Sequence, residues 1–133
     1  MKLHHIGYAV IDLINSSKAF SGLGFTITND IVIDNDRFVN ILFLDDGTNK
    51  IELVSPIAKG GSPVDGFLSK IGNGPYHLCF EVASLNDAIR DLKSKQYILI
   101  ESPAAAKAIE NRGVAFLYNK YIGIIELVEK KVG

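Results

Sequence analysis

The feature of this 133-residue chain that most restricts its fold is an internal repeat. Two segments, HIGYAVIDL from His5 and HLCFEVASL from His77, share one order of residue types: histidine, aliphatic, small, aromatic, any, valine, any, polar, leucine. Each half of the chain then closes on the tripeptide Ile-Glu-Leu, with its carboxylate at Glu52 or Glu126. The period of about seventy residues is too long for a solenoid repeat. We therefore interpret the chain as a duplicated half-domain.

The predicted elements follow the same order in both halves. Runs rich in isoleucine, valine and phenylalanine predict strands, and helical spacing with capping residues predicts helices. In the first half we expect strands near residues 3–10, 25–33, 37–45 and 49–55, with a helix over residues 13–21. In the second half we expect strands near residues 76–82, 97–101, 113–118 and 123–129, with a helix that a Ser84–Asp87 capping box opens and that continues to about Lys95. Each half is therefore predicted to form one βαβββ module.

The connecting segments carry turn and cap signals. Residues 45–47, Asp-Asp-Gly, predict a hairpin turn. Between the modules we expect a short helix over residues 63–71, with Ser62 as its N-cap and Asp65 completing a capping box. We expect residues 103–111 to form a loop.

Together these elements predict an α+β fold. We expect a single domain over residues 1–133, with module 1 at about 1–57, a linker helix at about 58–74 and module 2 at about 75–133. The two tandem βαβββ modules are expected to form a cupped, barrel-like mixed β-sheet with the helices outside. The composition, 47% hydrophobic and 22% charged, is that of an ordinary globular domain.

Charge and composition also exclude several kinds of partner. The formal net charge is −1 and no basic stripe is present, so we expect no nucleic-acid partner. The apolar runs are too short to span a bilayer, and the N-terminal segment does not resemble a signal peptide. The single cysteine, Cys79, cannot form an internal disulfide. We therefore expect a cytoplasmic protein without a membrane partner.

Strand alternation separates the two histidines from the core. In the first strand, His5 shares a face with Gly7 and Ala9, opposite the apolar Ile6, Tyr8 and Val10 face. The same alternation places His77 and Cys79 together, opposite Leu78, Phe80 and Val82. We expect Cys79 to be a buried, inert thiol. The small residues beside His5 would leave room for a bound molecule.

The two glutamates are predicted on the same faces as the histidines. Each lies between two aliphatic residues that pack into the core, so its carboxylate points the other way. If the two modules form a cleft, four groups meet there: His5, Glu52, His77 and Glu126. Two imidazoles and two carboxylates suit a divalent Ni, Co, Zn, Mn or Fe(II) ion, whereas a structural zinc site usually contains thiolates. A lone strand histidine is usually structural, but the repeated placement of both residue types favours the metal-ligand interpretation.

Four segments carry a family resemblance over nearly the whole chain. They are LHHIGYAV near the N-terminus, KIELVSP, SPVDGFLSKIGNGPYHLCFEV and the closing GIIELVE. These segments resemble the glyoxalase/vicinal-oxygen-chelate (VOC) superfamily, and within it most of all the methylmalonyl-CoA epimerases. The resemblance implies the glyoxalase/bleomycin-resistance fold and a metal held by His5, Glu52, His77 and Glu126. The His-Glu-His-Glu order is also similar to that of bacterial lactoylglutathione lyases (glyoxalase I).

The resemblance implies proton-transfer chemistry next to a carbonyl. A divalent-metal-dependent isomerase of this kind removes that proton through a metal-stabilised enediolate. It implies Glu126 as the acid/base group, with Glu52 serving the opposite face of the substrate. The implied substrate is a small molecule, an acyl-CoA or other thioester, and the implied assembly is a homodimer.

Three positions distinguish the alternatives. Asn40 stands where certain bacterial epimerases place a catalytic glutamate. Ala9 and Pro56 stand where lactoylglutathione lyases carry an Arg and an Asn, which favours a thioester over glutathione. The remaining alternative is a non-catalytic small-molecule binding or resistance protein of the same superfamily. Retention of all four candidate ligands disfavours that alternative.

Overall fold

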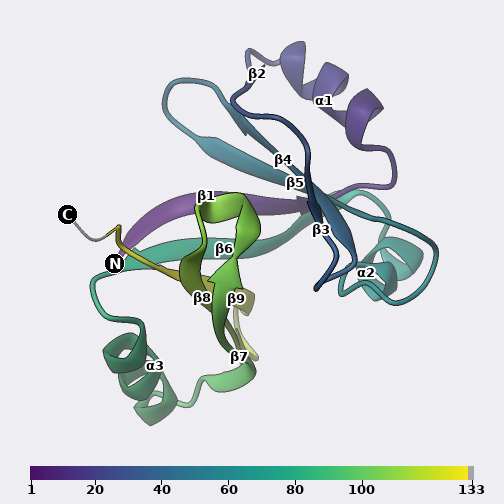
Figure 1. Ribbon diagram of the computed structural model, residues 1–133. Coiled ribbons are helices and arrows are strands. Elements are labelled where there is room, and N and C mark those ends of the chain that lie inside the picture. The colour runs from purple at the N-terminus through teal and green to yellow at the C-terminus, as the bar shows by residue number, and fades with distance from the viewer. Residues whose placement is uncertain (132–133) are drawn as a thin grey trace. The chain divides into compact units, whose positions relative to one another are not determined.

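The computed structural model describes residues 1–131 (Figure 1). Its strands and helices follow in the order β1 (Lys2–Ala9), α1 (Leu13–Ser21), β2 (Thr26–Ile27), β3 (Val32–Asp34), β4 (Val39–Asp45), β5 (Lys50–Pro56), α2 (Asp65–Lys70), β6 (Gly74–Val82), α3 (Leu85–Ser94), β7 (Ile98–Ala106), the 3-10 helix η1 (Lys107–Ile109), β8 (Arg112–Asn119) and β9 (Gly123–Glu129). The predicted α+β class is confirmed. Within residues 1–131, no helix is both long enough and apolar enough to cross a membrane.

The chain divides into two compact units. We call residues 5–76 the N-terminal unit, and residues 1–4 together with those from 77 onwards the C-terminal unit. In the N-terminal unit, β1 pairs in parallel with β5, with Ile6 opposite Ile51. β4 runs antiparallel to β5, and β2 and β3 both pair with β4.

Helix α1 covers one face of the N-terminal sheet, beside β2, β4 and β5 (Figure 1). It begins where the Asp12 carboxylate accepts the Asn15 backbone N–H at 2.9 Å, an N-cap that satisfies an otherwise unpaired donor. The core beneath it consists of Val10, Leu13, Leu42, Leu44, Ile51 and Leu53. Because Ile6 and Tyr8 pack against this core, the predicted apolar face of the first strand is confirmed.

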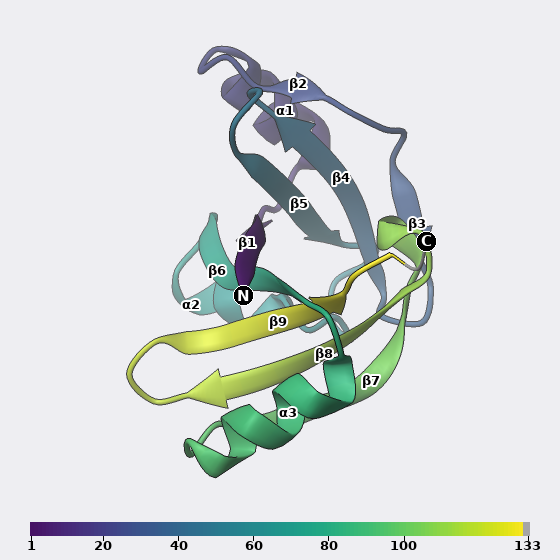
Figure 2. The ribbon, with the colours of Figure 1, turned by 90° about the vertical axis from the view of Figure 1, so that its left-hand side faces the viewer.

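The C-terminal unit repeats this arrangement. β6 pairs in parallel with β9, β9 runs antiparallel to β8, and β8 runs antiparallel to β7. Helix α3 lies along β7, β8 and β9 (Figure 2) and starts where Ser84 Oγ accepts the Asp87 backbone N–H. Its core includes Val82, Leu85, Ile89, Leu92, Leu117 and Leu127. Leu78, predicted to pack inward, is instead 40% exposed, because this cluster is built around the other end of β6.

The strand predicted over residues 25–33 is divided. The structure has the short strands β2 and β3, and the chain leaves the ladder between them. Asn29 explains the break, because its side-chain Oδ1 accepts the Phe43 backbone N–H at 3.2 Å. The Asn29 side chain thus accepts a backbone N–H of β4 that would otherwise donate to the backbone of a continuous neighbouring strand.

Two further predictions need correction. Helix α2 starts at Asp65, two residues later than predicted, and no side chain caps it. Only half of the predicted box forms: the Ser62 backbone N–H donates to Asp65 Oδ2 at 2.7 Å. Most of the predicted 103–111 loop is the end of β7 followed by η1. Register shifts in this edge strand accommodate Pro103, which has no N–H to donate.

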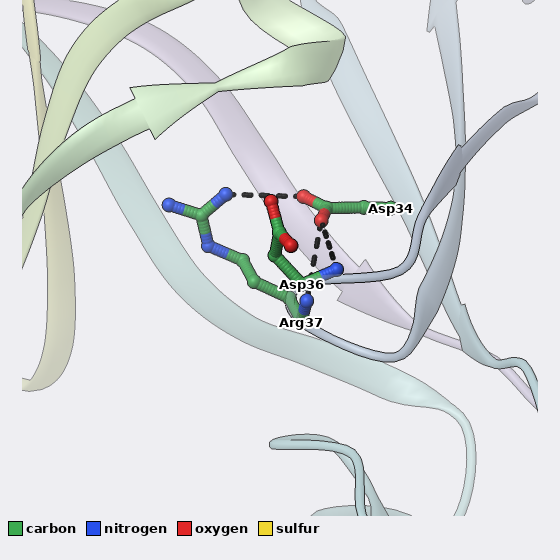
Figure 3. A network of polar contacts seen from close by, with 3 residues as sticks. All are labelled: Asp34, Asp36 and Arg37. Carbon is green, nitrogen blue, oxygen red and sulfur yellow. Dashed lines mark hydrogen bonds and ion pairs between the residues drawn. The ribbon is translucent and has the colours of Figure 1, made fainter.

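A buried aspartate organises the turn between β3 and β4 (Figure 3). Asp34 is 3% exposed, and its Oδ1 accepts the backbone N–H groups of Asp36 and Arg37 at 3.1 and 3.2 Å. Its other oxygen accepts Arg37 Nη1 at 3.0 Å. These bonds hold the chain through Phe38, whose φ of 58° lies in the left-handed region. The turn thereby fixes where β4 begins.

Candidate functional site

The first candidate pair lies on the two parallel strands of the N-terminal unit. Gly7 of β1 is directly opposite Glu52 of β5, and His5 lies two residues before Gly7 on the same face. His5 Nε2 and Glu52 Oε1 are 3.5 Å apart. Both residues are buried, with 1% and 5% exposure.

The second pair has the same construction in the C-terminal unit. Cys79 of β6 is directly opposite Glu126 of β9, and His77 lies two residues before Cys79. His77 Nε2 and Glu126 Oε1 are 3.1 Å apart, and both residues are buried. Gly7 in the N-terminal unit and Cys79 in the C-terminal unit therefore occupy equivalent positions. Each parallel strand pair brings one imidazole and one carboxylate together.

A phenylalanine completes each pair, and sequence reasoning missed both. Phe43 is the antiparallel partner of Glu52, and its ring meets that of His5 edge to face, with centroids 5.3 Å apart. Phe116 is the antiparallel partner of Glu126 and meets His77 in the same way at 5.5 Å. The available signal was the dipeptide Phe-Leu, which precedes Ile-Glu-Leu in each half. Each imidazole is therefore oriented by an aromatic edge as well as by a carboxylate.

The donor chemistry of both pairs fits a divalent metal. A neutral imidazole nitrogen and a carboxylate oxygen are both metal ligands, and in each pair they face each other at close range. Burying a carboxylate in an apolar setting is costly unless a cation or hydrogen bonds compensate. A structural His–Glu ion pair is the simpler alternative. The repetition of the same buried arrangement in two modules favours a shared ligand role.

Asn40 and Cys79, which the sequence also singled out, lie in different settings. Asn40 is opposite Ser55 and shares the face of Leu42, whereas Phe43 and Glu52 occupy the other face. The Asn40 amide and the Glu52 carboxylate therefore lie on opposite faces of the sheet. Cys79 is fully buried, as expected of an inert thiol.

A separate ion pair joins strands β6 and β8. Arg112 Nη2 donates to Glu81 Oε2 at 2.6 Å, and Arg112 Nε donates to the Glu129 carbonyl at 2.8 Å. The hydrogen bond from Arg112 lowers the pKa of Glu81, and the positive charges of His4 and Lys130 act in the same direction. This contact is structural, because it joins two strands at the start of β8.

Two modules of equal topology, each with a buried His–Glu pair, define a duplicated α+β protein with paired candidate metal ligands. Residues 4–116 match the profile of the Glyoxalase/Bleomycin resistance protein/Dioxygenase superfamily. The chain belongs to this superfamily, as the resemblance of its motifs predicted.

Several proteins of known sequence or structure are similar to this chain over most of its length. The mitochondrial methylmalonyl-CoA epimerase of Bos taurus is 34% identical over 131 residues, covering 95% of this chain and 73% of the relative. The solved methylmalonyl-CoA epimerase of Mycobacterium tuberculosis is 28% identical, with a TM-score of 0.85 over 98% of this chain and 89% of that one. A hypothetical protein of Bacillus halodurans is 29% identical, with a TM-score of 0.87 over 99% of this chain and 96% of that one.

Proposed function

We propose that this chain is a divalent-metal-dependent epimerase of methylmalonyl-CoA or a related acyl thioester. The observation that carries the proposal is the buried His–Glu pair of each module. It occurs in a chain that matches a methylmalonyl-CoA epimerase over 95% of its length. Fold alone would not justify the step, since one fold hosts many activities.

In this proposal His5, Glu52, His77 and Glu126 hold a single ion of Ni, Co, Zn, Mn or Fe(II). Four protein ligands would leave open positions on a six-coordinate ion. When bound, the ion supplies Lewis-acid stabilisation of negative charge that develops on the substrate carbonyl oxygen. The two histidines serve as anchors, and the edge of Phe43 or Phe116 packs against each ring.

The two glutamates carry the proton. Glu126 takes the proton from the carbon beside the thioester carbonyl. Glu52, once released from the ion, would then deliver a proton to the opposite face of that carbon, which inverts its configuration. The low exposure of both carboxylates, 5% for Glu52 and 4% for Glu126, limits competing exchange with bulk water.

A proton-exchange experiment tests the activity directly. One epimer of methylmalonyl-CoA is incubated in deuterated water with protein loaded separately with each of the five metals. We expect deuterium at the carbon beside the thioester carbonyl and formation of the other epimer. Absence of both with every metal would exclude the proposed epimerase.

The His-Glu-His-Glu ligand order supports lactoylglutathione lyase as a second candidate. That enzyme would need polar groups for the glutathione carboxylates, yet Ala9 is fully buried and Pro56 has no side-chain donor. Turnover of the methylglyoxal–glutathione hemithioacetal by nickel- or zinc-loaded protein would favour it.

A non-catalytic binding protein, in contrast, should be purified without stoichiometric metal. The family resemblance also leads us to propose a homodimer, which light scattering would test.

A further inference from the structure

The N-terminal unit contains a cavity that the proposed proton transfer does not use. Its volume is about 810 Å³, and it lies between the ends of β1 and β5 and the α2 segment. Pockets of roughly 300–1,000 Å³ are typical of small-molecule sites. Its walls are mainly apolar, with Ile11, Pro56, Ile57 and Leu68, and Lys59 lies among them.

The cavity lies further along the strand that carries Glu52. Pro56 follows Glu52 by four residues on β5, so the two share a face of the strand. At about 3.3 Å per residue, they are roughly 13 Å apart. A substrate whose reacting carbon lay at Glu52 would therefore need an extended arm to reach the cavity.

The lining has one exposed positive charge without an ion-pair partner. Lys59 is exposed and forms no ion pair within residues 1–131. Asp65 also lines the cavity, but its Oδ2 accepts the Ser62 backbone N–H. Ile11 and Ile57 leave 68% and 40% of their surfaces exposed, which is apolar area that a ligand would cover.

We infer that this cavity binds the coenzyme A part of the substrate, with its apolar wall against the pantetheine arm and the Lys59 ammonium against a phosphate. The inference rests on the proposed thioester substrate. Lysine binds phosphate as a point charge, so charge, rather than a fixed hydrogen-bond geometry, governs this contact. The apolar wall then provides most of the contact with the arm.

The test is the Lys59→Glu variant, with Lys70→Glu as the matched control. Lys70 lies on α2, is exposed and carries the same charge, but does not line the cavity. Calorimetry measures the binding of free coenzyme A, and kinetics compare the coenzyme A thioester with the N-acetylcysteamine thioester, which lacks the nucleotide. We expect Lys59→Glu to weaken coenzyme A binding about tenfold, the scale of one charged hydrogen bond, and Lys70→Glu to leave it unchanged.

Two outcomes separate this inference from the proposed activity. Equal coenzyme A affinity in wild type and Lys59→Glu would overturn the inference, even if epimerisation is observed. Coenzyme A binding that depends on Lys59, without proton exchange in any metal form, would support the cavity assignment and exclude the epimerase. We also expect the Lys59→Glu loss in kcat/KM to be larger for the coenzyme A thioester than for the truncated one. Equal losses for the two thioesters would contradict the assignment.

Discussion

At the residue scale, two glutamates with equivalent surroundings are proposed to do different work. Each faces a histidine on the neighbouring parallel strand and a phenylalanine on the antiparallel one. Equivalent packing explains why both can be ligands. It does not make them interchangeable, because each would act on one face of the substrate.

Substitution of each glutamate by glutamine separates these roles. Glu126→Gln removes the group that takes the proton, so we expect deuterium exchange to fall by roughly 10²–10⁴. Glu52→Gln removes the group that returns a proton to the opposite face. When one epimer is supplied, we therefore expect its deuterium exchange to be faster than its conversion to the other epimer. Nuclear magnetic resonance with each pure epimer measures both rates. Glu101→Gln, at an exposed position, is the control and should change neither rate.

The two phenylalanines give a second residue-scale prediction. Replacing Phe43 or Phe116 by leucine keeps an apolar side chain but removes the aromatic edge against the imidazole. We expect each variant to lose about 1 kcal/mol of unfolding free energy in urea titrations. We also expect weaker metal binding, because the ring is less firmly oriented. Unchanged metal affinity in both variants would show that the histidines need no such support.

At the element scale, local side-chain bonds determine where elements begin. Ser84 caps α3 as the sequence predicts, and Asp12 caps α1 in the same way, since a cap involves residues only three positions apart. Asn29, in contrast, interrupts a strand by bonding Phe43, fourteen residues away. Such a bond depends on strand register, which no local pattern in the sequence reveals.

The β3–β4 turn provides an element-scale prediction. Asp34→Ala would leave the backbone donors of Asp36 and Arg37 and the Arg37 guanidinium without their shared acceptor (Figure 3). We expect a loss of about 2–3 kcal/mol in unfolding free energy. Asp36→Ala, an exposed position in the same turn, is the matched control and should change it by less than about 0.5 kcal/mol. Equal losses in the two variants would show that burial of Asp34 has no special effect.

The Glu81–Arg112 pair predicts a pH dependence of stability. Because the hydrogen bond from Arg112 holds the folded-state pKa of Glu81 below the ordinary value of a glutamate, the pair stabilises the protein at higher pH. That contribution is lost as the pH falls through the lowered value. We expect Glu81→Gln to reduce the thermal midpoint at pH 7, with a smaller difference from wild type at pH 3. A difference that stays constant between these pH values would exclude the linkage.

At the scale of the whole molecule, the duplication permits two metal stoichiometries. One ion per chain would mean that both His–Glu pairs share it, as we propose, whereas two would mean that each pair holds its own. Metal bound only by the folded state stabilises it, by about 2.7 kcal/mol at a hundredfold excess over Kd.

We expect chelation to lower the thermal midpoint and one equivalent of divalent metal per chain to restore it. His5→Ala and His77→Ala should each abolish this metal-dependent shift, because both histidines serve one ion. Elemental analysis with differential scanning calorimetry measures the stoichiometry and the shift together. Two equivalents per chain, or a shift that survives either substitution, would contradict a shared site.

The sequence alone determined the duplicated βαβββ order, the α1 boundaries and the alternation that sets His5 and His77 apart from the core. These features depend on residue type, on φ/ψ preference and on hydrogen bonds between residues a few positions apart in the sequence. Only the tertiary structure decided that Phe43 and Phe116 meet the histidine rings, that Asn40 faces away from Glu52 and that Lys59 lines a cavity. Those relations join residues that are distant along the chain. Strand register, which global packing fixes, determines which of them meet.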